Sequence, residues 1–480
     1  MTWQRSSRQF LALDAAEVWS VVADVRRWPQ WCRAIGGADM DLPAGALATS
    51  GATGRYVPAA GWAGALHSRT APPLRVVEVV DGRRLVIEQP NPTGVMRVEW
   101  DVEPSHSPGD GAGCVFHQRV TSSGPLTPAV VLGAAGPIAA GFAEDVARLH
   151  ALVRPPAPAT SVAPESSGTP RTKVVIAGGT GSLGRALASD LTCRGHEVVL
   201  LTRSPRADLP YRQVIWDGEH QGAWTAELAE PERTSLINLA GELVDARPTP
   251  ENIARLRGSR VAPTRALVTA SRALDRPLRH WVQGSTTAIW SDAGDVRLVE
   301  SSPLPVGSAA LPQMTGIAQP WEEASDGANT DHLVLLRTSI VLQQGNPALV
   351  RLSQLTRAGL GGRVGSGQQW FSWIHIDDWL RIVRGCLGVE PDLPVPGGVL
   401  VAASDVPVRN RDLMASLRRH LRRPPAPPTP DVLLRVGAVV LRSDPALGLT
   451  GRHCTLQVLD GLGFTFMYPT IDDALDDLLT

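Results

Sequence analysis

A glycine-rich turn between an apolar strand and an amphipathic helix is the feature that most constrains the fold of this 480-residue chain. The segment VVIAGGTGSLGRALASDL, residues 174–191, carries glycines at 178, 181 and 184. In such a turn the first glycine permits a tight bend, the second lets a pyrophosphate approach the backbone, and the third lets the helix pack closely on the strand. The start of the helix adds N–H donors and a positive dipole end. The context predicts a dinucleotide site, rather than a turn without a ligand, at Gly178, Gly179, Thr180, Gly181, Ser182, Leu183 and Gly184.

Strands and helices alternate after this turn. Short apolar runs such as EVVLLTR, TSLINLAG and HLVLLRT are separated by helical segments at 181–194 and near 250–273. Repeated strand–helix units place parallel strands side by side and cover both faces of the sheet with helices. The second part of the chain is therefore predicted to be an α/β domain with a doubly wound parallel sheet.

The end of the second strand bears on the choice of cofactor. It reads LLTRSP, with Arg203 and Ser204 where an acidic residue would hydrogen-bond the ribose 2′-hydroxyl of NAD. A guanidinium suits a 2′-phosphate instead, so NADP(H) is favoured over NAD(H); the alternative is an arginine that only ends the strand. Asp217 is expected to meet the adenine. The turn after the fourth strand is expected to line the ribose and pyrophosphate with Asn238, Leu239, Ala240 and Gly241.

The first 152 residues have a different pattern. An alternating strand is followed by a helix that begins at Asp14, by antiparallel β-rich runs and by a long apolar helix from about 128 to 152. This order, with the segment EVWSVVADVRRWPQW, resembles the START-like helix-grip fold of the polyketide cyclase and lipid-transport type. The resemblance implies an apolar cavity for a hydrophobic ligand. The alternative is that Trp19, Trp28 and Trp31 fill a core, and the sequence leaves both open.

Composition sets the domain limits and excludes several classes. A segment rich in proline, 153–171, predicts a linker between domain 1–152 and a nucleotide-binding domain 172–400, followed by a C-terminal lobe 401–480. The net charge of −1 argues against a nucleic-acid partner. No apolar stretch reaches the length of a membrane span, so a cytoplasmic protein is expected. The five cysteines lack metal-site spacing, so no metal is expected.

The second part resembles the extended short-chain dehydrogenase/reductases, and in particular their atypical epimerase-like family. The segments that carry the resemblance are LINLAGE (236–242), RLRGSRVAPTRALV (255–268), LLRTSIVL (335–342), GLGGRVGSGQQWFSWIHIDDWLRIV (359–383) and the tail 456–479. The resemblance implies hydride exchange between the cofactor and a small organic substrate.

The usual proton relay of those enzymes is missing. They use a tyrosine followed four residues later by a lysine, which lowers the pKa of the phenol. Here the only lysine is Lys173, at the start of the first strand, and the helix predicted at 311–324 has Met314 and Ala318 at the two positions. The resemblance assigns the catalytic hydroxyl to Thr287 and a candidate acid or base to Glu300. Each has an alternative role, as a strand-end hydroxyl and as a loop-ordering carboxylate.

Two hypotheses from different classes follow. One is an NADP(H)-dependent oxidoreductase or epimerase in which Thr287 polarises the reacting oxygen and water, Glu300 or the substrate supplies the proton. The other is a non-catalytic NADP(H)-binding sensor or scaffold with a hydrophobic-ligand domain. The HIDD element, with His375, could transfer a proton, but we favour a role in joining the cofactor domain to the C-terminal lobe.

Overall fold

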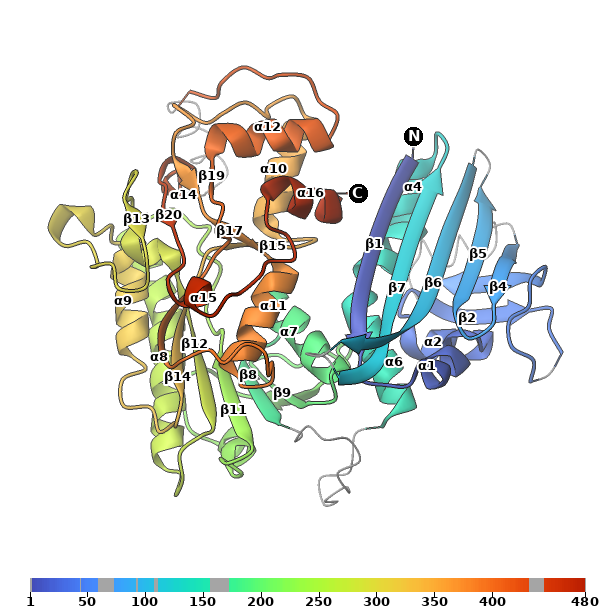
Figure 1. Ribbon diagram of the computed structural model, residues 1–480, viewed down its shortest axis with the longest axis horizontal. Helices are drawn as coiled ribbons and strands as arrows, with labels where there is room; N and C mark the ends of the chain where they lie inside the picture. Colours follow the sequence, from blue (N-terminus) through green and yellow to red (C-terminus); the bar gives the residue numbers. More distant parts are fainter. Residues whose placement is uncertain are drawn as a thin grey trace.

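The computed structural model describes residues 2–43, 45–58, 73–91, 94–107, 111–155, 172–430 and 444–479. Two seven-stranded sheets lie side by side, one from each part of the chain (Figure 1). Most of the predicted linker, from residue 156 to 171, lies outside the described residues, so its extent stays a prediction.

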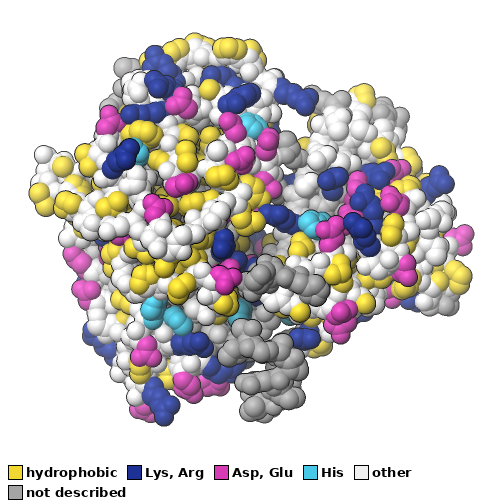
Figure 2. All heavy atoms as spheres, in the orientation of Figure 1, with side chains coloured by type: hydrophobic (Ala, Val, Ile, Leu, Met, Phe, Trp, Pro, Cys, Tyr) yellow, Lys and Arg dark blue, Asp and Glu magenta, His cyan; other side chains and the backbone are white. Residues whose placement is uncertain are grey.

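The first sheet is antiparallel, in the order β1-β7-β6-β5-β4-β3-β2. Its longest pairing joins β6 and β7, from Met96 opposite Ser122 to Ser107 opposite Gly111. The outer face carries alternating basic and acidic side chains, such as Arg97 between Glu88 and Glu99, and Figure 2 shows both charges intermixed over this domain. The strands are β1 (Thr2–Leu11), β2 (Ile35–Met40), β3 (Thr53–Pro58), β4 (Leu74–Val80), β5 (Arg84–Asn91), β6 (Gly94–Ser107) and β7 (Gly111–Ser123).

Helices cover the inner face of this sheet. Asp14 caps the first of them by accepting a hydrogen bond from the Ala16 N–H at 2.8 Å. The single long helix predicted at 128–152 is wrong, because the chain passes through a π-turn and bends by 49° at Gly141. Glycine favours the break, and Pro137 within the preceding turn lacks an N–H for a continuous ladder. The helices are α1 (Ala15–Val22), η1 (Val25–Arg27), α2 (Trp28–Trp31), α4 (Thr127–Val130), η2 (Val131–Ala135), α5 (Gly136–Ala140) and α6 (Phe142–Val153).

Aromatic side chains fill the space between sheet and helices. The rings of Trp28 and Trp31 both lie edge-on to Trp100, with centroids 5.3 Å apart in each pair. Among the described residues, the cavity beside Trp28 and Met96 measures about 10 Å³, hardly the room that one water molecule needs. This packing favours the core role of the tryptophans over a preformed ligand pocket.

The second sheet is parallel, in the order β10-β9-β8-β11-β12-β14-β18. Successive residues of each strand face opposite sides, so Val174 and Ile176 join the core under helix α7, whereas Val175 joins the core under helix α8. The strands are β8 (Lys173–Ala177), β9 (Glu197–Thr202), β10 (Arg212–Ile215), β11 (Thr234–Asn238), β12 (His280–Thr286), β14 (Leu333–Thr338) and β18 (Gly398–Ala402). The helices of this domain are α7 (Ser182–Cys193), η3 (Ala223–Leu228), α8 (Pro250–Arg272), η4 (Thr287–Trp290), η5 (Gly307–Ala309), α9 (Thr315–Glu323) and α11 (Ile376–Cys386).

A smaller lobe rises over the carboxyl edge of the parallel sheet (Figure 1). The predicted boundary at residue 400 is wrong, because it falls inside strand β18 and because the lobe takes elements from both sides of it. Its core joins Leu349 and Trp373 to Leu413 and Leu475. The elements are β13 (Arg297–Leu298), β15 (Ile340–Leu342), α10 (Pro347–Arg357), β16 (Trp370–Phe371), β17 (Trp373–His375), β19 (Val408–Arg409), α12 (Asn410–His420), α14 (Ala446–Leu449), β20 (His453–Cys454), α15 (Val458–Gly461) and α16 (Ile471–Leu479).

Within the described part of the chain, no single helix is long and apolar enough to cross a membrane; the bent pair Thr127–Ala140 and Phe142–Val153 meets that criterion only when taken together.

Candidate cofactor and catalytic site

The glycine turn has the geometry that the sequence predicts. Gly178 adopts a positive φ of 76°, and a Cβ there would come within 2.7 Å of the Leu239 backbone. A Cβ on Gly184 would lie 2.6 Å from the Cα of Gly179, so the helix could not approach the turn as closely. A Cβ on Gly181 would meet only the Gly178 carbonyl oxygen, at 3.3 Å. The backbone at Gly181, which caps helix α7, is thus accessible to a ligand, while Thr180, Ser182 and Leu183 lie beside it in the turn and first helical residues.

The turn after β11 lies against this loop. Leu239 N–H donates to the Ala177 carbonyl at 2.9 Å, and the buried Asn238 amide donates to Thr264 Oγ1 at 2.8 Å and to Gln283 Oε1 at 3.1 Å. The Asn238 side-chain oxygen accepts from Ala240 N–H at 3.1 Å. Asn238 therefore shapes the turn that carries Ala240 and Gly241, and its side chain faces the protein.

The loop after β9 presents the expected cationic residue to solvent. Arg203 and Ser204 are both exposed, and the Arg203 guanidinium makes no hydrogen bond or ion pair with another described residue. Ser204 N–H donates to Thr202 Oγ1 at 3.2 Å, which fixes the start of the loop. An arginine with free donors at this edge is available to an anion.

Asp217 lies beyond the end of β10, which stops at Ile215. Its carboxylate accepts from the N–H groups of Glu219 and His220 at 2.8 and 2.9 Å and from the His220 ring at 2.7 Å. The backbone hydrogen bond from His220, with that from Glu219, lowers the pKa of Asp217 to about 2. These contacts make Asp217 a turn-forming residue, and its contact with adenine stays a prediction.

Three hydroxyls follow one another at the end of β12. Ser285 is buried and donates to Glu322 Oε1 at 2.5 Å, while Thr287 is 5% exposed and lies near the Cys454 thiol. Thr286, between them, is half-buried and accepts from Ala288 N–H at 3.2 Å. Thr287 therefore faces the C-terminal lobe, and Thr286 is the more accessible hydroxyl at this strand end.

The positions of the missing relay are apolar and closed. Met314 is 4% exposed and precedes helix α9, and Ala318 is 1% exposed within it. Helix α9 begins only at Thr315, later than the predicted 311, because the segment before it forms turns. Lys173 is at the amino end of strand β8, the end opposite to the glycine turn, and is paired with Glu227 at 2.9 Å.

Two arginines near these positions were missed by the sequence reasoning. The Nη1 atom of Arg452 donates to the Ser291 carbonyl at 2.9 Å and contacts Met314 Sδ at 3.5 Å. Arg260 lies over the Trp321 ring at 5.3 Å and donates to the Glu242 carbonyl at 2.7 Å. Burial lowers the pKa of Arg260 to about 10. Neither arginine has a carboxylate within ion-pair distance in the described part of the chain.

Glu300 is held by main-chain donors. Its Oε1 accepts from Val401 N–H at 3.3 Å, and its Oε2 accepts from Gln457 N–H at 3.1 Å. The carboxylate thus ties the loop after β13 to strand β18 and to the start of α15. This arrangement favours the loop-ordering role over that of a free acid or base.

The HIDD element joins helix α11 to the C-terminal tail. The buried His375 caps α11 by accepting from Asp377 N–H at 3.2 Å, and its Nε2 lies 3.3 Å from Asp477 Oδ2. Asp378 accepts from the N–H groups of Met467 and Tyr468 at 2.8 and 3.2 Å. These contacts favour a joining role for His375 over proton transfer.

No group of three or more His, Cys, Asp or Glu side chains in the described ranges is arranged to hold a metal ion. The parallel sheet, the glycine turn and the exposed arginine after the second strand define a nucleotide-binding protein of the extended short-chain dehydrogenase type, here preceded by a helix-grip domain.

Comparisons with known proteins relate each part of the chain to a different family. Residues 4–154 match the family of polyketide cyclases/dehydrases and lipid-transport proteins, and residues 174–309 match the NAD dependent epimerase/dehydratase family. The first part of the chain is thus similar to the polyketide cyclase-type proteins and the second part to the epimerase family.

The relatives are similar mainly in the second part. The epimerase family protein SDR39U1 of Bos taurus is 28% identical over 311 residues, which cover 64% of this chain and 99% of the relative. The chloroplastic SDR39U1 homolog of Arabidopsis thaliana is 29% identical and covers 63% of this chain and 85% of the relative.

Two solved structures resemble the fold. The crystal structure of human SDR39U1 with NADPH has a TM-score of 0.54 at 26% identity and covers 64% of this chain and 99% of that one. A nucleoside-diphosphate sugar epimerase from Corynebacterium glutamicum, at 22% identity and a TM-score of 0.57, covers 99% of this chain and 90% of that one. The second shares the fold of both parts.

Proposed function

We propose that this protein is an NADP(H)-dependent oxidoreductase or epimerase that acts on a small organic molecule. The observation that carries the proposal is the accessible glycine turn together with the exposed Arg203, which pairs with no other residue that the structure describes. The turn offers backbone N–H groups to a pyrophosphate, and Arg203 with Ser204 offers donors to a 2′-phosphate. That human SDR39U1, at 26% identity, is described with NADPH supports the same cofactor class here.

The chemistry rests on the hydroxyls at the end of β12. Bound NADP(H) would supply or accept the hydride. Thr287, or its more accessible neighbour Thr286, would hydrogen-bond the reacting oxygen. Glu300 would have to leave its main-chain donors to move a proton, so water or a group of the substrate is the better proton source.

The alternative is a non-catalytic NADP(H)-binding sensor or scaffold. The apolar residues at the relay positions favour it, because Met314 and Ala318 cannot exchange protons. The cavity of about 10 Å³ beside Trp28 and Met96, among the described residues of the N-terminal domain, gives no support to a stored hydrophobic ligand in this alternative or in the first.

Cofactor binding is tested by titrating the purified protein with NADPH and with NADH while following tryptophan fluorescence. We expect NADPH to bind more tightly, and Arg203→Ala to weaken NADPH binding about tenfold while NADH binding changes little. Arg276→Ala, an exposed arginine that follows α8, is the matched control. Equal affinity for both nucleotides in the wild type would contradict the NADP(H) preference.

Turnover separates the two hypotheses. NADPH oxidation and NADP⁺ reduction are followed by absorbance with a panel of carbonyl compounds and alcohols. For an enzyme, Thr286→Ala or Thr287→Ala lowers turnover without changing NADPH affinity, whereas Thr269→Ala, on the exposed face of α8, has no effect. Binding without turnover across the panel would favour the sensor.

A further inference from the structure

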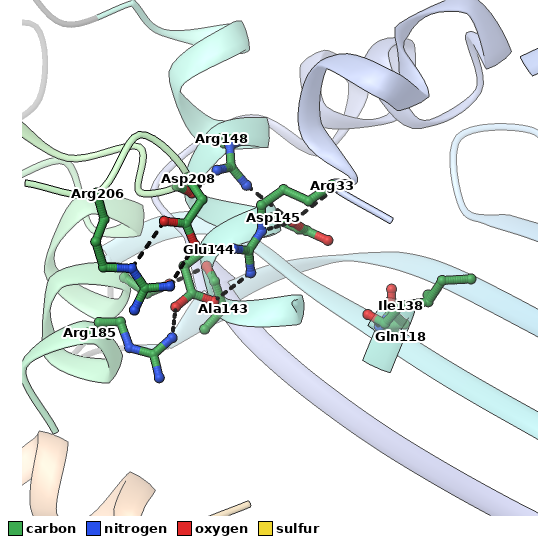
Figure 3. A network of polar contacts seen from close by, with 11 residues as sticks. Arg33, Gln118, Ile138, Ala143, Glu144, Asp145, Arg148, Arg185, Arg206 and Asp208 are labelled. Carbon is green, nitrogen blue, oxygen red and sulfur yellow. Dashed lines mark hydrogen bonds and ion pairs between the residues drawn. The ribbon is translucent and has the colours of Figure 1, made fainter. Parts of the chain in front are cut away.

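The N-terminal domain packs against the helix that follows the glycine turn. Ser189 Oγ of α7 donates to the Ala143 carbonyl of α6 at 2.6 Å, and Arg185 Nη1 lies 2.8 Å from Glu144 Oε1 (Figure 3). Arg185 is in the first turn of α7, the helix whose start belongs to the proposed pyrophosphate site. The two domains therefore meet at the helix that follows the glycine turn.

The loop after β9 is held by its own polar contacts. Arg206, three residues after Arg203, forms two hydrogen bonds with Asp208, at 3.0 and 2.6 Å. Its backbone N–H and carbonyl are both bonded to the Gln213 amide at 2.8 Å. The hydrogen bond from Arg206 lowers the pKa of Asp208, which therefore stays ionised.

Arg33 of the N-terminal domain reaches this loop. Its Nη1 lies 3.1 Å from Asp208 Oδ2, the oxygen that also accepts from Arg206 (Figure 3). Arg148 of α6 adds a hydrogen bond to the Asp208 carbonyl. Asp208 is thus shared between one arginine of its own loop and the arginines of the other domain.

Two buried carboxylates fix Arg33 in place. Glu144 and Asp145, each with its side chain 4% exposed, lie 3.2 Å from the Arg33 guanidinium. A guanidinium held by two buried carboxylates keeps one direction, and its remaining donor points to Asp208. Buried carboxylates therefore fix the geometry of this contact between the domains, unlike that of an ion pair between two exposed side chains.

A carboxylate that binds two arginines neutralises the charge of each arginine less than a carboxylate that binds only one. While Arg33 binds Asp208, Arg206 keeps attraction for an additional anion. Without Arg33, Asp208 would belong to Arg206 alone and the loop would lose one tether. This loss would weaken the attraction of the loop for a 2′-phosphate, whereas a ribose 2′-hydroxyl carries no charge to be attracted.

We propose that Arg33 of the N-terminal domain is a specificity-determining positioning residue for the 2′-phosphate of NADP(H), acting through Asp208 on Arg206. The inference rests on the proposed NADP(H) binding. It gives the N-terminal domain a part in the choice between NADP(H) and NAD(H).

Arg33→Lys is the variant that tests it. Lysine keeps a positive charge beside Glu144 and Asp145 but lacks the fork that reaches Asp208 as well. We expect the Kd of NADPH to rise about five- to tenfold and that of NADH to change less than about twofold, as for loss of one charge-assisted contact to the phosphate-binding loop. Arg8→Lys is the matched control. Arg8 also contacts the other domain, at Tyr468, which is far from this loop along the chain.

A double-variant cycle tests the route through Asp208. In an Asp208→Asn background, Arg33→Lys should no longer change the ratio of the two Kd values. The proposal would be overturned if Arg33→Lys weakened the binding of NADPH and NADH equally or left the ratio of their Kd values unchanged. It would also be overturned if the ratio changed as much in the Asp208→Asn background. Each of these outcomes would leave the NADPH binding of the wild type in place. Failure of the wild type to bind NADPH would overturn the proposed function and this inference together. Circular dichroism and thermal unfolding verify that each variant is folded.

Discussion

Lys173 Nζ lies 2.9 Å from Glu227 Oε2, at the amino end of strand β8, whereas the glycine turn follows the carboxyl end of the same strand. Arg212 binds the other oxygen of the same carboxylate at 2.5 Å. Burial opposes ionisation of Glu227, but the hydrogen bonds from Lys173 and Arg212 outweigh it and lower its pKa. The only lysine of the chain therefore stabilises the amino end of a strand and takes no part in the candidate site.

Lys173→Met should affect stability alone. We expect the free energy of unfolding to fall by about 1–3 kcal/mol, less than for a carboxylate left with no partner, because Arg212 remains. Denaturant unfolding gives the stability, and the NADPH titration should be unchanged. A large loss of NADPH affinity in a folded variant would contradict this assignment.

Alanine at two glycines should separate binding from folding. Gly181→Ala adds a methyl group where only the Gly178 oxygen is near, at 3.3 Å, so the fold should be retained while NADPH affinity falls about tenfold. Gly184→Ala places a Cβ 2.6 Å from Gly179 Cα and should cost about 1–3 kcal/mol of stability. Thermal unfolding and fluorescence titration of both variants make the comparison, and an unstable Gly181→Ala variant would refute it.

A buried ion pair supports the end of β12. Arg337 forms two hydrogen bonds with Glu322, both at 2.9 Å, and both side chains are less than one-tenth exposed. Arg337→Met leaves a buried carboxylate without its partner and should cost about 3–5 kcal/mol. The control is Arg233→Met, whose pair with Glu230 is exposed and should be worth less than about 1 kcal/mol. Similar losses in the two variants would argue against a special role for the buried pair.

Acid should destabilise the protein through His280. Burial, with the neighbouring His332, lowers the pKa of His280 to about 4, below its ordinary value of 6.5. The unfolded chain therefore takes up this proton first as the pH falls, and stability present above pH 6.5 is lost progressively toward pH 4. After allowance for solvent screening, the loss should be about 1–2 kcal/mol.

Unfolding free energies between pH 4 and 8 measure this effect, with His280→Gln as the comparison. The glutamine variant should lack this part of the acid loss, because it has no group that titrates there. An identical pH dependence in the wild type and the variant would exclude His280 as its source.

Local patterns predicted the parts of the fold that depend on near neighbours in the chain. The glycine spacing predicted the turn at Gly178, and apolar strands between helices predicted the parallel sheet, because such patterns reflect backbone sterics and burial period. The bend at Gly141 was missed since apolar periodicity continues across it. The lobe boundary failed because its core pairs Leu349 with Leu475 across the chain, and no local signal encodes that contact.

The candidate site divides in the same way. By itself the sequence predicted the class of ligand, from the backbone of the glycine turn and the charge of Arg203, and it determined that a tyrosine–lysine relay is absent. Only the tertiary structure decided that Thr287 faces Cys454, that main-chain donors occupy Glu300, that Arg452 lies against Met314 and that Arg33 reaches Asp208. Each of these depends on segments far apart in sequence being brought together, and packing of the whole chain, which no short stretch specifies, sets their distances.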